Sequence, residues 1–177
     1  MVSQEKKTEY SPQRNSRRYV LSVLVDNQAG VLSRVSGLFS RRGFNIDSLT
    51  VGETSNSGVS RMTIVVTGDE YVLEQIIKQL SKLVEVISIQ HCQPHETVMR
   101  ELALIKVGVD GTKRPQVLET ANIYRARIVD VSVDSVVIEV TGSEDKVASL
   151  IRLLEPIGIR ELVRTGLTAM GRGGEAL

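Results

Sequence analysis

The sequence predicts an α+β protein built from two tandem βαββαβ units. Apolar residues alternate in short runs, as in strands, and follow helical spacing in the segments between those runs. The pattern of the first half also returns in the second half, since IVVTGDE at Ile64 matches IEVTGSE at Ile138, 74 positions later, and the apolar stripe of the following helix repeats at that offset. Because strand end, helix cap and helix stripe repeat together, we interpret the halves as two related ferredoxin-like units.

The first unit is expected over residues 18–92. Its elements, in order, are a strand at Tyr19–Val25, a helix whose apolar stripe runs from Val31 to Phe39, strands at Ile46–Val51 and Arg61–Val66, a second helix and a strand at Val84–Ile89. Gly43 should end the first helix in a left-handed conformation. Thr67 and Glu70 are spaced as a capping box for the second helix.

The second unit is expected over residues 100–165. Its elements are a strand at Leu102–Val107, a helix with Pro115 in its first turn, and strands around Ile128 and at Val136–Val140. Residues 93–99 are interpreted as a linker, and residues 1–17 and 166–177 as polar tails. Four strands with both helices on one face leave the other face or an edge uncovered, so each unit should pair with its twin or with another chain.

Charge is balanced along this chain of 177 residues, with 22 Lys and Arg against 21 Asp and Glu. This balance favours neither nucleic acid nor membrane as a partner. Arg14, Arg17 and Arg18 could form a nucleic-acid arm, but no aromatic residues accompany them in the pattern of such arms. Apolar runs are too short for a membrane span, and the amino terminus lacks the apolar region of a secretory signal. With Cys92 as the single cysteine, we expect a cytoplasmic protein.

Residues with catalytic chemistry are sparse. The sequence has two histidines and shows no convincing nucleophile–base order, no phosphate-binding lysine loop and no Cys-x-x-Cys pair. His91, Cys92 and His95 lie within five residues, but such close spacing seldom lets three ligands reach one tetrahedral ion. We therefore predict no catalytic residue and no metal site, and interpret this segment as part of the linker.

The loop Asp26 to Gly30 is the strongest candidate for a binding site. It leads from a strand into the first helix, whose amino terminus presents backbone N–H groups and a partial positive charge. The amides of Gly30 and Val31 would suit a carboxylate, and the side chain of Asn27 would suit an ammonium or a carboxylate. A zwitterionic amino acid would be satisfied at both ends. The same residues would equally serve as a simple cap and turn, and the residues alone leave both explanations open.

The stretch from Tyr19 to Glu70 resembles the small, regulatory subunit of acetohydroxyacid synthase, also called acetolactate synthase. The family pattern N-x-x-G-[AV]-L-S-R-[VI]-x-G-L-F-x-R-R-G-[FY]-N-I-x-S-L-[TS]-V is met at every position from Asn27 to Val51. S-R-M-T-I at Ser60, R-E-L-A-L-I-K-V at Arg100 and R-A-R-I-V-D-V at Arg125 are also similar to the family, so the resemblance covers about Arg18 to Gly174.

This resemblance implies that the first unit is an ACT domain, the second is ACT-like, and the chain performs no catalysis itself. It would form a homodimer through its ACT domains, activate the catalytic subunit, and confer feedback inhibition by valine, in some members also by leucine or isoleucine. Valine would lie between two chains, with Asn27, Gly30 and Val31 from one chain and Asn45 and Ile46 from its partner. Thiamine diphosphate, Mg²⁺ and FAD would belong to the catalytic subunit, and this chain would hold no cofactor.

Two other functions are alternatives to a regulatory subunit. A tandem ACT sensor acting on transcription would bind regulators or DNA and leave acetolactate formation unchanged, whereas an enzyme would show turnover by the purified chain. In the second unit the loop VDGTKRP, from Val109, lacks the Asn-x-x-Gly turn and holds a proline. We therefore expect no equivalent amino-acid site there.

Overall fold

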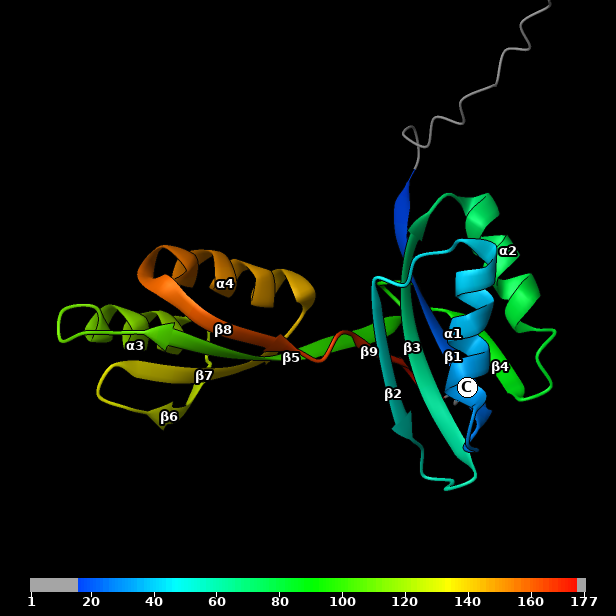
Figure 1. The fold of residues 1–177 in the computed structure, drawn as a ribbon, viewed down its shortest axis with the longest axis horizontal. Coiled ribbons are helices and arrows are strands. Elements are labelled where there is room, and N and C mark those ends of the chain that lie inside the picture. Colours follow the sequence, from blue (N-terminus) through cyan, green and yellow to red (C-terminus); the bar gives the residue numbers. More distant parts are fainter. Residues whose placement is uncertain (1–15, 175–177) are drawn as a thin grey trace, which may run out of the picture.

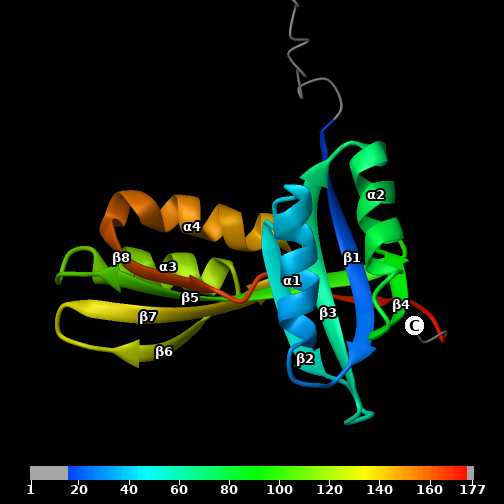
Figure 2. The same cartoon turned by 45° about the vertical axis from the view of Figure 1, so that its right-hand side comes forward.

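A computed structural model describes residues 16–174 and shows two antiparallel sheets, each with two helices on one face (Figures 1 and 2). Most of the amino-terminal tail expected at 1–17 lies outside the described residues. The first domain contains β1 (Arg17–Asp26), α1 (Val31–Arg42), β2 (Ser48–Glu53), β3 (Val59–Gly68), α2 (Glu70–Leu80) and β4 (Val86–His91). Its strand order is β2-β3-β1-β4, which leaves β2 and β4 at the edges.

The second domain repeats this plan. It contains β5 (Thr97–Gly108), α3 (Arg114–Ile123), β6 (Arg127–Val131), β7 (Ser135–Gly142), α4 (Glu144–Gly158), β8 (Ile159–Arg164) and the short strand β9 (Thr168–Gly171). The strand order β6-β7-β5-β8 matches that of the first sheet position by position. The predicted tandem α+β fold, with two ferredoxin-like βαββαβ units, is confirmed.

Each core lies between the sheet and its two helices, as the apolar spacing predicts. In the first domain Leu21, Val23 and Val25 of β1 are fully buried against the stripe of α1, which includes Val35 and Phe39. The repeat is also visible in the packing: Leu73, Ile76 and Leu80 of α2, and their counterparts Val147, Leu150 and Leu154 of α4, are all buried. Gly43 ends α1 with a φ of 70°, as expected.

The cap of α2 differs from the predicted box. β3 extends to Gly68, so the first residue able to leave the strand conformation and cap the helix is Asp69, whose Oδ1 accepts a hydrogen bond of 2.8 Å from the amide of Val72. Thr67 is still in the strand, and its hydroxyl donates instead to Asp47. The repeat preserves this cap, because Ser143 occupies the corresponding position before α4.

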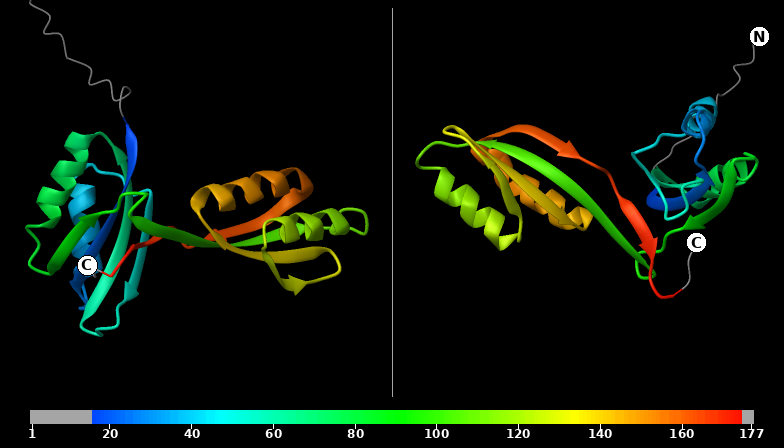
Figure 3. Two further views of the ribbon diagram at one scale, coloured as in Figure 1. Left: turned by 180° about the vertical axis from the view of Figure 1, so that it is seen from behind. Right: turned by 90° about the horizontal axis from the view of Figure 1, so that it is seen from below.

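The segments predicted as linker and carboxyl-terminal tail are partly strand. β5 begins at Thr97 and pairs there with β9, with Thr97 opposite Gly171 and Arg100 opposite Thr168. β5 and the carboxyl-terminal segment run side by side between the domains (Figure 3). Leu167 and Ala169 are buried against the face of the first sheet that the helices leave open, next to Val20, Val65 and Cys92. Part of the sheet face expected to need cover is therefore covered by the same chain.

Candidate functional site

The loop between β1 and α1 is held against the β2–β3 turn. The amide of Asn27 donates to the carbonyl of Gly58, and its side-chain Nδ2 donates to the carbonyl of Ser57, both at 2.9 Å. Asp26 donates its amide to the carbonyl of Glu85, at 2.9 Å. These bonds explain why the connection is longer than a two-residue turn: it must reach both neighbouring loops before the helix begins.

The amino terminus of α1 has no side-chain cap. Gly30 is the N-cap residue, with a φ of 88°, a left-handed conformation that other residues adopt only with strain. The N-caps of α2 and α4 accept amide hydrogen bonds through Asp69 and Ser143. Within residues 16–174, by contrast, no acceptor reaches the amides of Leu32 and Ser33. Together with the helix dipole, these amides suit an anionic group from outside the domain. The predicted use of the Val31 amide is wrong, because this amide donates to the carbonyl of Gln28, at 3.4 Å.

Asn27, Gly30 and Val31 lie together at this end of α1, with Val31 buried and the other two exposed. Asn45 and Ile46 follow the opposite end of the helix. Because α1 has 12 residues, the two groups are separated by about 18 Å along its axis. Asn45 is exposed, and Ile46 is half-buried against the first core. One chain therefore does not bring the five predicted residues together.

The corresponding loop of the second domain contains an acceptor of its own. The Oδ1 atom of Asp110 accepts hydrogen bonds from the amide and hydroxyl of Thr112, at 2.9 and 2.6 Å, and from the amide of Lys113, at 2.8 Å. These hydrogen bonds lower the pKa of Asp110 to about 2, and the bond from the Thr112 hydroxyl contributes most. The N-cap residue of α3, Lys113, makes no side-chain cap either, but the helix has Pro115, which lacks an N–H, in its first turn, and the negative charge of Asp110 lies beside it. Both features disfavour an external carboxylate, which supports the expectation that the second domain has no equivalent site.

We expect the contribution of Asp110 to the stability of the second domain to depend on pH. Its folded-state pKa is lowered, so its stabilisation should be complete above the unfolded value of about 3.9 and be lost as the pH falls toward 2. The measurement is thermal unfolding of the parent and Asp110→Asn from pH 7 to pH 2. The parent should be more stable at pH 7, and the difference should close in the acid range. A difference independent of pH would contradict this role of the carboxylate.

The histidine–cysteine segment has a structural explanation. Cys92 is buried under the first sheet, and burial raises the pKa of its thiol. The ring of His91 packs edge-on against that of Tyr19, with 5.4 Å between ring centroids. Among residues 16–174, no group of three or more His, Cys, Asp or Glu side chains is arranged to hold a metal ion. In the same residues no helix is long and apolar enough to cross a membrane.

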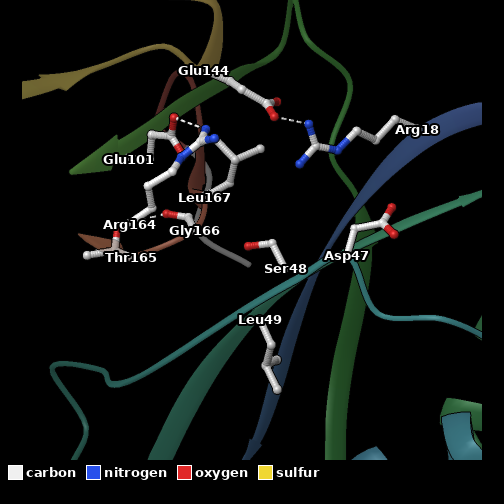
Figure 4. Close-up of a pocket in the computed structure, with 10 residues that line it drawn as sticks. All are labelled: Arg18, Asp47, Ser48, Leu49, Glu101, Glu144, Arg164, Thr165, Gly166 and Leu167. Carbon is white, nitrogen blue, oxygen red and sulfur yellow. Dashed lines mark hydrogen bonds and ion pairs between the residues drawn. The ribbon is translucent and has the colours of Figure 1, made fainter. Parts of the chain in front are cut away.

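Sequence reasoning missed a polar cavity between the two domains (Figure 4). Its volume is about 360 Å³, and side chains of both domains line it. Arg18 of β1 forms an ion pair with Glu144 at the start of α4, and Arg164 of β8 pairs with the buried Glu101 of β5. The partners in these pairs lie 126 and 63 residues apart in sequence, so no local pattern could have revealed them.

The hydroxyl of Ser48 also faces this cavity. It is buried, has no hydrogen-bond partner among residues 16–174, and lies close to Gly166 (Figure 4). Next to it, the hydroxyl of Thr50 donates to the carbonyl of Thr165, at 3.1 Å. The start of β2, which immediately follows Asn45 and Ile46, is therefore in direct contact with the carboxyl-terminal segment.

Comparison with known proteins covers both domains. Residues 21–88 match a family model described as the small subunit-like ACT domain of AHAS, and residues 100–173 match one described as the small subunit of acetolactate synthase. A probable acetolactate synthase small subunit from Archaeoglobus fulgidus is 56% identical over 158 residues, which are 89% of this chain and 99% of the relative. This chain belongs to the acetolactate synthase small-subunit family. The acetolactate synthase small subunit of Mycolicibacterium smegmatis is 54% identical, over 88% of this chain and 91% of the relative.

A solved structure of the family supports the arrangement of the domains. The acetolactate synthase small subunit of Thermotoga maritima superimposes with a TM-score of 0.83 and 43% sequence identity, over 90% of this chain and 99% of that chain. The first domain is thus an ACT domain, as the resemblance implies. The second family model matches residues 100–173, so the matched region includes β9.

Proposed function

We propose that this chain is the regulatory subunit of an acetolactate synthase in branched-chain amino-acid biosynthesis. It binds the catalytic subunit, raises its activity and confers feedback inhibition by valine, with leucine and isoleucine as further candidate effectors. Thiamine diphosphate, Mg²⁺ and FAD belong to the catalytic subunit, and the holoenzyme acts in the cytoplasm. One observation carries the effector site: the amino terminus of α1 lacks a cap beside an open sheet edge, in a chain of this family.

The open edge of β2 explains how a site could use both ends of α1. β2 ends at Glu53 beside the loop of Asn27, which bonds to Gly58, and it begins at Ser48, just after Asn45. If two copies pair their β2 strands antiparallel about a two-fold axis, the end of one strand lies beside the start of the other. Asn27 of one chain then faces Asn45 of its partner, and the homodimer has two equivalent sites.

The chemistry of these residues suits an aliphatic amino acid. The free amides of Leu32 and Ser33 suit its carboxylate, and the side-chain oxygens of the two asparagines suit its ammonium group. Ile46 is a half-buried apolar residue beside these polar groups and would contact the side chain of the effector, whereas Val31 is buried in the core and would support the site from inside the domain. Gly30, as an N-cap residue without a side chain, leaves the amides of α1 open, so all five residues named by the resemblance have a role.

Feedback follows from linkage between two binding events. If valine prefers an arrangement of the dimer that activates the catalytic subunit poorly, a coupling free energy of ~1–3 kcal/mol changes the affinity by about 5- to 150-fold. The coupling is reciprocal, so adding the catalytic subunit must change the affinity for valine by the same factor.

We expect Asn27→Ala to weaken valine binding by about tenfold or more, because it removes the side-chain oxygen at the ammonium end and the bond that fixes the loop to Ser57. Isothermal titration of the full-length chain with L-valine measures this loss. Acetolactate formation by the reconstituted holoenzyme should become resistant to valine while its activation persists.

A matched control is Asn122→Ala, since Asn122 is exposed on α3, far from β2 in sequence and fold, and its side chain makes no hydrogen bond within residues 16–174. This variant should bind valine like the parent. If a folded, dimeric parent neither binds valine nor alters acetolactate formation by the catalytic subunit, the proposed function is wrong.

A further inference from the structure

The side chain of Asn45 is held in one orientation by Asp47. Its Nδ2 donates to Oδ1 of Asp47, at 2.9 Å. Asp47 is itself fixed, because Oδ2 accepts from the Thr67 hydroxyl at 2.6 Å and its amide donates to the carbonyl of Val65 at 2.9 Å. An ionised carboxylate only accepts hydrogen bonds, so the NH₂ end of Asn45 must face it. The carbonyl oxygen of Asn45 is turned away, and no donor among residues 16–174 reaches it.

The side chain of Asn27 is oriented in the same way, by an acceptor that faces its NH₂ group. Its Nδ2 donates to the backbone carbonyl of Ser57, which also only accepts, so its oxygen is left without a donor in the described part of the chain. The two asparagines of the proposed site thus both present oxygen, whereas the start of α1 presents N–H groups. The site has an accepting end and a donating end.

We propose that Asp47 is a positioning residue that makes the effector site selective for a free α-ammonium group. This inference rests on the proposed function. The ammonium donates to the fixed oxygen of Asn45, and the negative charge of Asp47, one side chain away, strengthens that contact. An α-hydroxy acid of the same carbon skeleton offers one neutral donor, and an α-keto acid offers none. Either would leave acceptors unpaired, which is how a polar site rejects close analogues.

Without Asp47 the amide of Asn45 is free to rotate by half a turn. It can then present NH₂ in place of oxygen and accommodate a ligand that has no ammonium group. Removing Asp47 should therefore reduce or abolish the preference for valine over the hydroxy acid, and a general loosening of the fold would not have this effect.

The test is isothermal titration of the full-length chain with L-valine and with L-2-hydroxy-3-methylbutanoate, which has a hydroxyl where valine has the ammonium. The parent should bind valine at least about tenfold more tightly. Asp47→Ala should lose about tenfold in affinity for valine and change by less than about twofold for the hydroxy acid. Inhibition of the reconstituted holoenzyme by valine should weaken by the same factor.

Two further variants separate positioning from structure. Thr67→Val removes one hydrogen bond to Asp47 but leaves the bond to Asn45, so valine should bind within about twofold of the parent. Asp47→Asn keeps an oxygen that can accept from Asn45, so its loss should be smaller than that of Asp47→Ala. An equal loss for both ligands, or unchanged valine binding in Asp47→Ala, overturns the inference but not the site. Absence of valine binding and of feedback in the parent overturns the proposed function and the inference with it.

Discussion

Arg164→Ala should destabilise the second domain by about 3 kcal/mol. Its guanidinium contacts both carboxylate oxygens of Glu101, with Nε at 3.3 Å from Oε2, and the Glu101 side chain is 2% exposed. Removing the arginine would leave a buried carboxylate without its partner. The free-energy cost of keeping this unpaired charge out of water is far larger than the stability that an exposed ion pair contributes. Urea unfolding followed by circular dichroism, with hydrogen exchange of β5, β7 and β8, would measure the change and locate it in this domain.

The matched control lies on the same two strands. Lys106 pairs with Glu161 across β5 and β8, but both side chains are exposed, at 43% and 61%. Lys106→Ala should therefore leave the free energy of unfolding within the error of the measurement. Replacing both partners of the buried pair, in Glu101→Leu with Arg164→Leu, should be milder than Arg164→Ala alone. Equal effects of Arg164→Ala and Lys106→Ala would show that water reaches Glu101 in solution.

The sequence predicts the order of helices and strands because each of these elements has a local signature. Apolar spacing decides which face of α1 and α2 is buried, and Gly43 decides where α1 ends. The sequence does not predict the cap of α2 correctly, because its position depends on how far β3 continues. Pairing with β1 determines this, since Arg17 lies opposite Gly68. The sequence does not predict β9 for a similar reason. Its four residues are too few to show the alternation of a strand, and they pair with Thr97–Arg100, which are distant in sequence.

The residues of the candidate site also differ in whether a local sequence signature marks them. Asn27 and Gly30 stand out locally, because an asparagine and a glycine before an amphipathic helix mark either a simple cap and turn or an anion site, and only the structure shows that the helix has no side-chain cap. Nothing local marks Asn45 or Ile46, which came from the family resemblance alone. The side chain of Asn45 is oriented by its hydrogen bond to Asp47. Asp47 is in turn fixed by Thr67, which lies on a neighbouring strand of the folded sheet. Such cooperation between strands is visible only in the fold.

Gly166→Ala should loosen the carboxyl-terminal segment from the first sheet. Gly166 has a φ of 82°, and a Cβ there would lie 2.1 Å from the hydroxyl oxygen of Ser48. The left-handed conformation alone costs about 1–2 kcal/mol for a residue with a side chain, and the overlap adds about 1–3 kcal/mol. Hydrogen exchange of Thr168–Gly171 should become faster. Because this segment joins the second domain to the strand that follows Asn45, we expect valine binding to persist while inhibition of the holoenzyme weakens.

Two variants distinguish the contact with Ser48 from backbone strain. Gly173→Ala has nearly the same φ, 87°, but open space around the added Cβ, so it should show the strain without the overlap. Ser48→Ala in the Gly166→Ala background removes the overlapping oxygen, which is buried and unpaired, and should restore slow exchange of β9 and part of the feedback. If Gly173→Ala weakens feedback as much as Gly166→Ala, or if the second substitution restores nothing, the contact between β2 and the carboxyl-terminal segment does not carry the effector signal.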